Sequence, residues 1–464
     1  MTKSIILVLL ISISGHSQPV QFQTKFSEPF AVFQFVNSLS AGSLNNVYKK
    51  LYNGSRFARK EYNDLISQFD SLNLGYNFEF NDYPAGQKVG IDVSSFLKRN
   101  LILSESVQDF KLRSMGLVPN EALIKLTLLL KDFTPVYDEV VYQPFKLRFE
   151  EQLKGISDLV KAKNLNNLFS EAVQFYRSSW DPSVPFIFCF YPLPHSKGFT
   201  ATAVSNVAIS GIADSLDTYT GLLSVMMHEI SHVLYDERPK SFWNEMDGWF
   251  VTNPSKVSRY AYSLFNESMA TAVGNGYIGG QLNGKEDTAR SWYGEKYINA
   301  MAKATYPIVK DYIVNHKPID HDFVNAYIKT YEDKFSGWLT DLNYVMTGAI
   351  VVSDDPADFH LVDSLFRFYG HEHVNEISTL SLEKLQANHG TKIIIVNSRN
   401  EEKLGVLKRG FKELKEWHHH ADHDFEYTVF LSDKTYLLIL NNVNGTTGEK
   451  LRSLLIKESN LSVQ

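Results

Sequence analysis

Two histidines and a glutamate within five consecutive residues have the types and the spacing needed for a metal-dependent catalytic site. His228, Glu229 and His232 belong to the segment His-Glu-Ile-Ser-His. Residues four apart share one face of an α-helix, so both imidazoles can reach one ion while Glu229 projects beside them. Zinc accepts such ligands and lowers the pKa of a bound water to about 7, which lets a neighbouring carboxylate take its proton. The spacing predicts zinc-dependent hydrolysis; the simpler alternative is two buried core histidines.

The third protein ligand must come from another part of the chain. Tyr235 and Arg238 occupy the positions where the metzincin pattern requires Gly and His, so that pattern is absent. A glutamate from a following helix is the other common solution, and Glu267 lies within an Asn-Glu-Ser-Met-Ala segment. Glu237, almost contiguous with the first helix, and Glu245, in a tryptophan-rich segment, are the rival carboxylates.

This combination resembles the gluzincin metallopeptidases, in which HExxH on one helix is completed by an NExxA-type glutamate on the next. The resemblance covers about 70 residues, roughly 204 to 276. It implies that His228, His232 and Glu267 bind Zn²⁺ and that Glu229 acts as the general base. It also implies a peptide or protein substrate.

Two features depart from the gluzincin pattern. The 34 residues between His232 and Glu267 form a longer connection than the best-known gluzincins have. Thr271 stands where thermolysin-like enzymes use an aspartate to orient a ligand histidine, so a backbone carbonyl, Asn266 or Asp247 is expected to do so here. The candidates for stabilising the transition state are Tyr277, His316, His321, Tyr327 and Tyr344.

The histidine pair requires a helix, and apolar residues at helical spacing predict one from Thr218 to Asp236. A loop over Arg238–Lys256 is expected to lead to a second helical pattern, Val257–Val273. Gly274 and Gly276 are expected to stop that second helix.

Apolar runs before the histidine helix predict strands of a small sheet. They cover Val184–Tyr191 and Ala203–Ile209. Because Val204–Ile209 directly precedes the helix, it is expected to be an edge strand with which an extended peptide substrate could pair.

The predicted fold class is α+β: a mainly helical, zincin-like chain with a small sheet, followed by a small C-terminal α+β domain. A strand at Lys392–Val396 and a hairpin over Glu426–Leu440 indicate that last domain. The predicted divisions are a signal peptide over residues 1–17, a mostly helical region over 18–182, a zincin-like catalytic domain over 183–375 and the C-terminal domain over 376–464.

The first residues predict export. Lys3 precedes the apolar run Ile5–Ile13, and small residues follow at Gly15 and Ser17, as in a signal peptide. The run is shorter than a membrane span of about 20 residues, and no other segment approaches that length. We therefore expect a bacterial protein that is periplasmic or secreted, without an integral membrane segment after signal removal.

Composition excludes other classes of function. The formal net charge is -6, with 46 basic and 52 acidic residues, so no basic face for nucleic acid is expected. The single cysteine, Cys189, allows no intramolecular disulfide and lies in an apolar run. The histidines at 418–420 and 423 form a dense cluster that is more typical of a solvated linker than of a second metal site.

Two hypotheses follow from the sequence. The first is an exported zinc metallopeptidase that hydrolyses peptide bonds. The second is a catalytically silent zincin-like binding or structural module, with or without bound metal. Retention of Glu229 beside the two histidines favours the enzyme.

Overall fold

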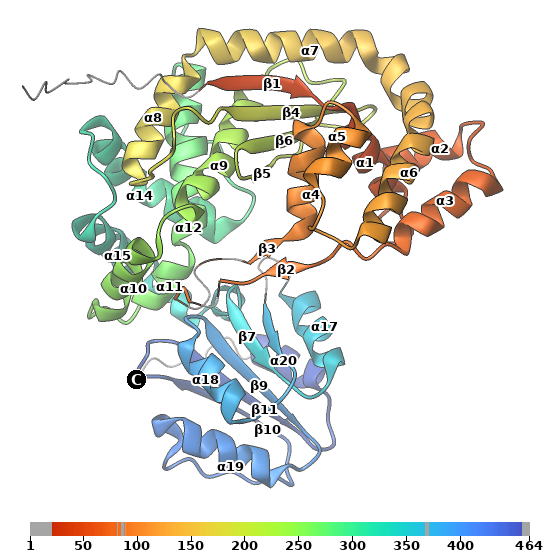
Figure 1. Ribbon diagram of the computed structural model, residues 1–464. Coiled ribbons are helices and arrows are strands. Elements are labelled where there is room, and N and C mark those ends of the chain that lie inside the picture. Colours follow the sequence, from red (N-terminus) through yellow and green to blue (C-terminus); the bar gives the residue numbers. More distant parts are fainter. Residues whose placement is uncertain (1–20, 81, 85–87, 89, 367–370, 457–464) are drawn as a thin grey trace, which may run out of the picture.

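The computed structural model describes residues 21–80, 82–84, 88, 90–366 and 371–456. The chain is mixed α/β and 56% helical, with several small sheets (Figure 1), which agrees with the mainly helical α+β class predicted. The predicted signal peptide lies outside the described residues. Within the described part, no helix combines the length and the apolar character needed to cross a membrane.

The first sheet has four strands in the order β1-β4-β6-β5. They are β1 (Phe22–Phe26), β4 (Phe186–Leu193), β5 (Thr202–Val204) and β6 (Val207–Ala213). β1, β4 and β6 run parallel, and β5 pairs antiparallel with β6 at one edge. The predicted edge strand Val204–Ile209 is thus divided. Ser205, in the left-handed region at φ 52°, lies between β5 and β6, and Val204 ends the edge strand β5. Val207–Ile209 belong to β6, which pairs with β5 on one side and with β4 on the other.

Both faces of β4 are buried, so its side chains alternate between two cores. One core contains Ile187, Cys189 and Tyr191, and the other contains Phe186, Phe188 and Phe190. Cys189 packs as a small apolar residue, as predicted, and burial raises the pKa of its thiol to about 12.

Helices of the N-terminal region cover the first of these faces. This region contains α1 (Glu28–Leu39), α2 (Val47–Asn53), α3 (Lys60–Asp70), β2 (Asn77–Phe78), β3 (Ile91–Asp92), α4 (Val93–Leu103), α5 (Val107–Arg113), α6 (Asn120–Tyr137) and the π-helix η1 (Asp138–Tyr142). Because β1 pairs with β4, the first sheet extends across the predicted boundary at residue 182.

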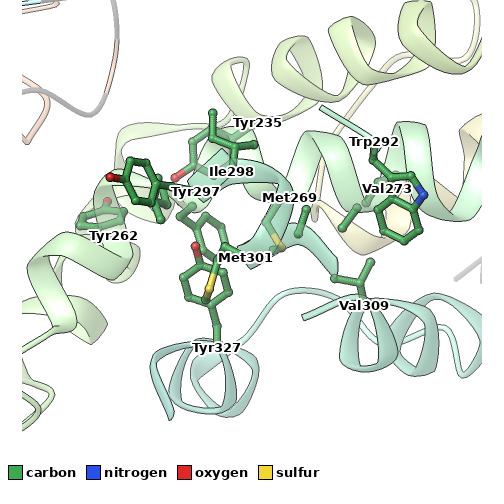
Figure 2. Packing of buried hydrophobic residues seen from close by; sticks show 14 of the residues in the cluster. Tyr235, Tyr262, Met269, Val273, Trp292, Tyr297, Ile298, Met301, Val309 and Tyr327 are labelled. Carbon is green, nitrogen blue, oxygen red and sulfur yellow. The ribbon is translucent and has the colours of Figure 1, made fainter. Parts of the chain in front are cut away.

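A larger helical layer covers the second face. Its elements are α7 (Gln143–Ala162), α8 (Leu165–Phe175), α9 (Thr220–Asp236), α10 (Lys240–Thr252), α11 (Ser258–Ser263), α12 (Phe265–Ala270), the π-helix η2 (Thr271–Ile278), α13 (Gly279–Asn283), α14 (Lys296–Val314), α15 (His321–Phe335), the 3-10 helix η3 (Ser336–Thr340) and α16 (Leu342–Val345). Figure 2 shows part of this core, including Met269 of α12, Val273 of η2 and Met301 of α14.

The second sheet has five strands in the order β10-β11-β9-β7-β8. Its region contains β7 (Ala349–Val352), α17 (Pro356–Leu365), β8 (Glu372–Val374), α18 (Thr379–Ala387), β9 (Thr391–Asn397), α19 (Glu401–Gly410), the 3-10 helix η4 (Lys412–Leu414), β10 (Phe425–Phe430), β11 (Tyr436–Asn442) and α20 (Thr447–Ile456). The predicted strand and hairpin correspond to β9, β10 and β11. The sheet begins with β7, well before the predicted boundary at residue 376, because the short apolar run Ala349–Val352 is a fully buried parallel strand.

Candidate metal centre

Helix α9 presents both histidines of the motif. Its buried apolar side chains recur at helical spacing and are Leu222, Leu223, Met226, Met227, Ile230 and Leu234. The helix ends at Asp236, as the sequence predicted. His228 and His232 lie on adjacent turns, and their ring centroids are 4.8 Å apart.

The connection from α9 toward Glu267 contains a helix where the sequence predicted a loop. The helix is α10, and its buried side chains are Phe242, Trp243, Met246 and Phe250. They follow one face of the helix, and their packing stabilises it although Gly248 lies within it. The 34 residues between His232 and Glu267 thus include two helices, α10 and α11.

Glu267 is the carboxylate that the fold brings to the two histidines. It lies in the first turn of α12. Its Oε1 is 3.5 Å from His232 Nε2, and its Oε2 is 3.6 Å from His228 Nε2. The two imidazole Nε2 atoms are themselves 3.1 Å apart.

The two rival carboxylates lie in other contacts. Glu245 on α10 pairs with Arg177 at 3.1 Å. Glu237, which follows α9, accepts a hydrogen bond from the Ser178 hydroxyl. Neither joins the group formed by the two histidines and Glu267.

The donor set fits a zinc ion. All three ligand atoms lie within 4.8 Å of one another, and in the described part of the chain no other group of three His, Cys, Asp or Glu side chains is close enough to share one ion. Tetrahedral bonds of about 2.0–2.1 Å would separate ligand atoms by about 3.3 Å. The two imidazole Nε2 atoms are 3.1 Å apart, and each lies 3.5 or 3.6 Å from a different carboxylate oxygen of Glu267. Glu267 Oε2 is buried and lacks a hydrogen-bond partner, so one lone pair is left for a ligand.

The three side chains of the group shift one another's pKa values. Burial, together with the charge of His232, lowers the pKa of His228 to about 3. Burial also opposes charge on His232, but the hydrogen bond and the charge of Glu267 outweigh it and raise the pKa of His232 to about 9. Burial likewise raises the pKa of Glu267, but His232 and then His228 reverse the effect, so the net pKa is lowered. The two imidazoles thus hold the Glu267 carboxylate in its ionised form.

Glu229 is suited to proton transfer. Burial raises its pKa to about 7, although the charge of His232 acts in the opposite direction. A carboxyl group with a pKa near neutrality can accept a proton and return it within one catalytic cycle.

Groups on α12 and η2 orient the histidines. Asn266 Oδ1 is 2.9 Å from His232 Nδ1, so this amide oxygen accepts the hydrogen of the Nδ1-H tautomer. His228 is hydrogen-bonded to the Ala270 backbone, and Thr271 Oγ1 lies 3.5 Å from His228 Nδ1. Asn266 and a backbone group therefore take the place of the missing aspartate, whereas Asp247 makes its contacts elsewhere.

The π-helix η2 continues through the glycines that were predicted to end the helix. Gly274 packs directly on α9: a Cβ atom built at this position would lie 2.5 Å from both the backbone nitrogen and the Cα of His228. Ser224 donates a hydrogen bond to the Gly274 carbonyl at 3.1 Å. Gly274 is therefore required for close contact between two helices, and it does not cap one.

Gly274→Ala is expected to destabilise the protein by about 3 kcal/mol, because the added methyl group would displace the backbone of α9 at His228. Gly221→Ala on α9 is the matched control, since a Cβ atom at Gly221 would meet nothing within 4 Å. Urea unfolding measures both. Equal midpoints for the two variants would contradict the assigned role of Gly274.

Tyr293 is a site residue that the sequence did not reveal. Its ring stacks on His228, with centroids 5.6 Å apart, and its hydroxyl interacts with Glu267 and lowers the pKa of that carboxylate. The five predicted candidates contact other groups: Tyr277 bonds Glu171, Tyr327 bonds Ser268, Tyr344 bonds the Tyr260 carbonyl, His321 contacts Asn325, and His316 follows the end of α14. Tyr293 lies between α13 and α14, where no periodic pattern marks it.

No protein-family model, curated protein or solved structure matches the chain. The interpretation of the site therefore rests on its residues and their geometry.

Proposed function

We propose that this chain is an exported zinc metallopeptidase of gluzincin type that hydrolyses peptide bonds in the periplasm or outside a bacterial cell. One observation carries the proposal: His228, His232 and Glu267 converge on one point with Glu229 beside them. The order of the ligands along the chain, and their origin on α9 and α12, also match the gluzincin arrangement that the sequence resembles.

Each residue of the site has a role in the proposed reaction. His228, His232 and Glu267 hold the ion, and zinc bound by them would activate a water and polarise the substrate carbonyl. Glu229 takes the proton of the attacking water and delivers it to the leaving amine. The Tyr293 hydroxyl donates a hydrogen bond to the carbonyl oxygen as negative charge develops on it.

A peptide is the substrate that the surroundings favour. β5 lies at an edge of the first sheet and close to α9, so an extended chain could add to that edge. A cavity of about 350 Å³ is lined by residues that include Gly294, Tyr297, Thr347 and Phe366, and Gly294 directly follows Tyr293 in the chain. It has room for a substrate side chain.

Tyr293→Phe is expected to lower kcat about 100-fold and to change KM little, because the hydroxyl acts mainly on charge that develops in the transition state. Tyr277→Phe is the control, since Tyr277 donates to Glu171 at 3.0 Å. Steady-state peptide hydrolysis measures both. Equal kcat values for the two variants would remove Tyr293 from the mechanism.

The direct test combines metal analysis with a peptidase assay on the purified protein. About one zinc per chain together with hydrolysis of an unstructured protein substrate is expected. Bound zinc without hydrolysis would favour the catalytically silent module instead. An absence of bound zinc after dialysis against excess metal would overturn the zinc peptidase and leave only a silent module without metal.

A further inference from the structure

The second sheet packs directly on the helices that lead to Glu267. The core that contains α9 and α12 also includes Val351 of β7, Ile393 of β9 and Leu438 of β11. Contacts from this C-terminal part converge on the end of α10 and on α11, the helix immediately before α12. We call these contacts, which are made by Asp247 with Arg259 and His389, by Tyr260 and by Lys434, the α11 clamp.

The first contact of the clamp is a partly buried polar cluster of Asp247, Arg259 and His389. Asp247 Oδ1 on α10 lies 3.5 Å from Arg259 Nη1 on α11 and 2.7 Å from His389 Nε2, in the segment between α18 and β9. The three side chains are 23%, 10% and 15% exposed, so water screens the cluster weakly. One carboxylate thus ties α10 and α11 to the C-terminal part.

The second contact centres on the Tyr260 hydroxyl of α11, which is buried. It lies 2.9 Å from Thr391 Oγ1 at the start of β9, and it accepts a hydrogen bond of 3.1 Å from the backbone N–H of Tyr436 in β11. α11 is thereby bonded to two strands of the second sheet.

The third contact is the Lys434 ammonium, which comes from the turn between β10 and β11. It donates hydrogen bonds to the carbonyls of Val251 and Asn253 at the end of α10, and to the Ser258 hydroxyl of α11 at 3.3 Å. A cation at a helix C-terminus also interacts favourably with the helix dipole.

The clamped helices are packed against the helix that carries the third ligand. Phe250 of α10 stacks on Tyr262 of α11 at 4.1 Å, and it contacts Phe265 of α12 at 5.5 Å. Only Leu264 separates α11 from α12. A shift of α11 would therefore be transmitted to Glu267.

We infer that the α11 clamp positions Glu267 against His228 and His232, so that the C-terminal part acts as a support of the metal centre. Asp247, Tyr260 and Lys434 are positioning residues in this account. The inference rests on the proposed function, because it concerns the same ion. It predicts that metal affinity depends on side chains that do not touch the metal ligands.

The test measures zinc affinity of the full chain by chelator competition, and the absorption spectrum of the Co²⁺-loaded protein. Asp247→Asn is expected to weaken zinc binding by about 10-fold and to alter the Co²⁺ spectrum. This is the lower end of the range for loss of a group bonded directly to a ligand, because Asp247 acts on Glu267 through α11. Tyr260→Phe, which removes only a hydroxyl, is expected to have the same effect to a smaller degree.

Asp424→Asn is the matched control. Asp424 precedes β10 and accepts hydrogen bonds from Lys450 and from backbone N–H groups of the turn after β11, so its loss weakens the C-terminal part without touching the clamp. Unchanged zinc affinity in this variant supports the inference. Wild-type affinity and spectrum in both clamp variants, or equal weakening in Asp424→Asn, would overturn it. A wild-type protein that binds no zinc would overturn the proposed function as well.

Discussion

Glu229→Gln is expected to reduce peptide hydrolysis by about 10²- to 10⁴-fold while the protein keeps its zinc. Glutamine has nearly the same shape as glutamate, but its amide cannot accept the proton of the attacking water. Glu229 is absent from the ligand group, so its replacement leaves His228, His232 and Glu267 unchanged. The effect is expected in kcat, with KM close to that of the wild type.

The measurement is steady-state hydrolysis of a peptide together with the zinc content of the same preparation. Glu237→Gln is a suitable control, because Glu237 bonds to Ser178 and lies outside the ligand group. Near-wild-type activity in Glu229→Gln would show that another group, or no protein group, removes the proton. Loss of zinc in this variant would mean that Glu229 is itself a ligand.

Glu267→Gln is expected to weaken zinc binding by more than about 100-fold. Loss of an outer contact alone typically weakens metal affinity by about 10- to 100-fold, and a direct ligand contributes more. The amide also brings no negative charge to balance the ion beside His228 and His232. Activity is expected to fall in parallel with bound zinc and to recover partly at high zinc concentration.

The rival carboxylate provides a matched control for that variant. Glu245 was a competing candidate in the sequence, but it pairs with Arg177 on the surface of the protein. Glu245→Gln is therefore expected to keep wild-type zinc affinity in the same chelator competition. If Glu245→Gln loses zinc and Glu267→Gln does not, the assignment of the third ligand is wrong.

The sequence predicted α9 well because its signal is local. Ten of its side chains are buried, they recur at helical spacing, and Pro239 follows its end. The sequence placed Glu267 near the histidines only through its resemblance to the gluzincin pattern. The structure adds the distances of 3.5 and 3.6 Å between the carboxylate oxygens of Glu267 and the two imidazole Nε2 atoms. Local periodicity and motif spacing therefore predict individual helices and candidate ligands.

Elements that depend on tertiary packing could not be predicted in the same way. α10 contains Gly248 and is followed by Asn253 and Pro254, residues typical of loops, and burial of its aromatic face stabilises it. β7 is a four-residue apolar run, which periodicity cannot distinguish from part of a helix. Gly274 resembles a helix cap in sequence, and only its contact with His228 explains its presence.

Tyr293 could not be predicted for a different reason. It lies outside any regular element, in a segment held by its neighbours: Trp292 packs against Gly276 of η2, and the Trp292 carbonyl accepts a hydrogen bond from Asn275. The separation of Tyr293 from His228 along the sequence matches no motif, so it does not indicate that the two residues are in contact. The five candidates chosen from the sequence were selected by residue type, which does not report position in space.

The parallel pairing of β1 with β4 affects how the chain reaches its native state. Phe22 pairs opposite Phe186, so 164 positions separate the partners along the sequence. Pairing over such a distance is slow, because a long loop must close before any contact stabilises it. As the chain is synthesised, Phe22 and Phe26 remain without their partner strand until β4 has emerged. β1 is thus completed late, and until then it is exposed to chaperones.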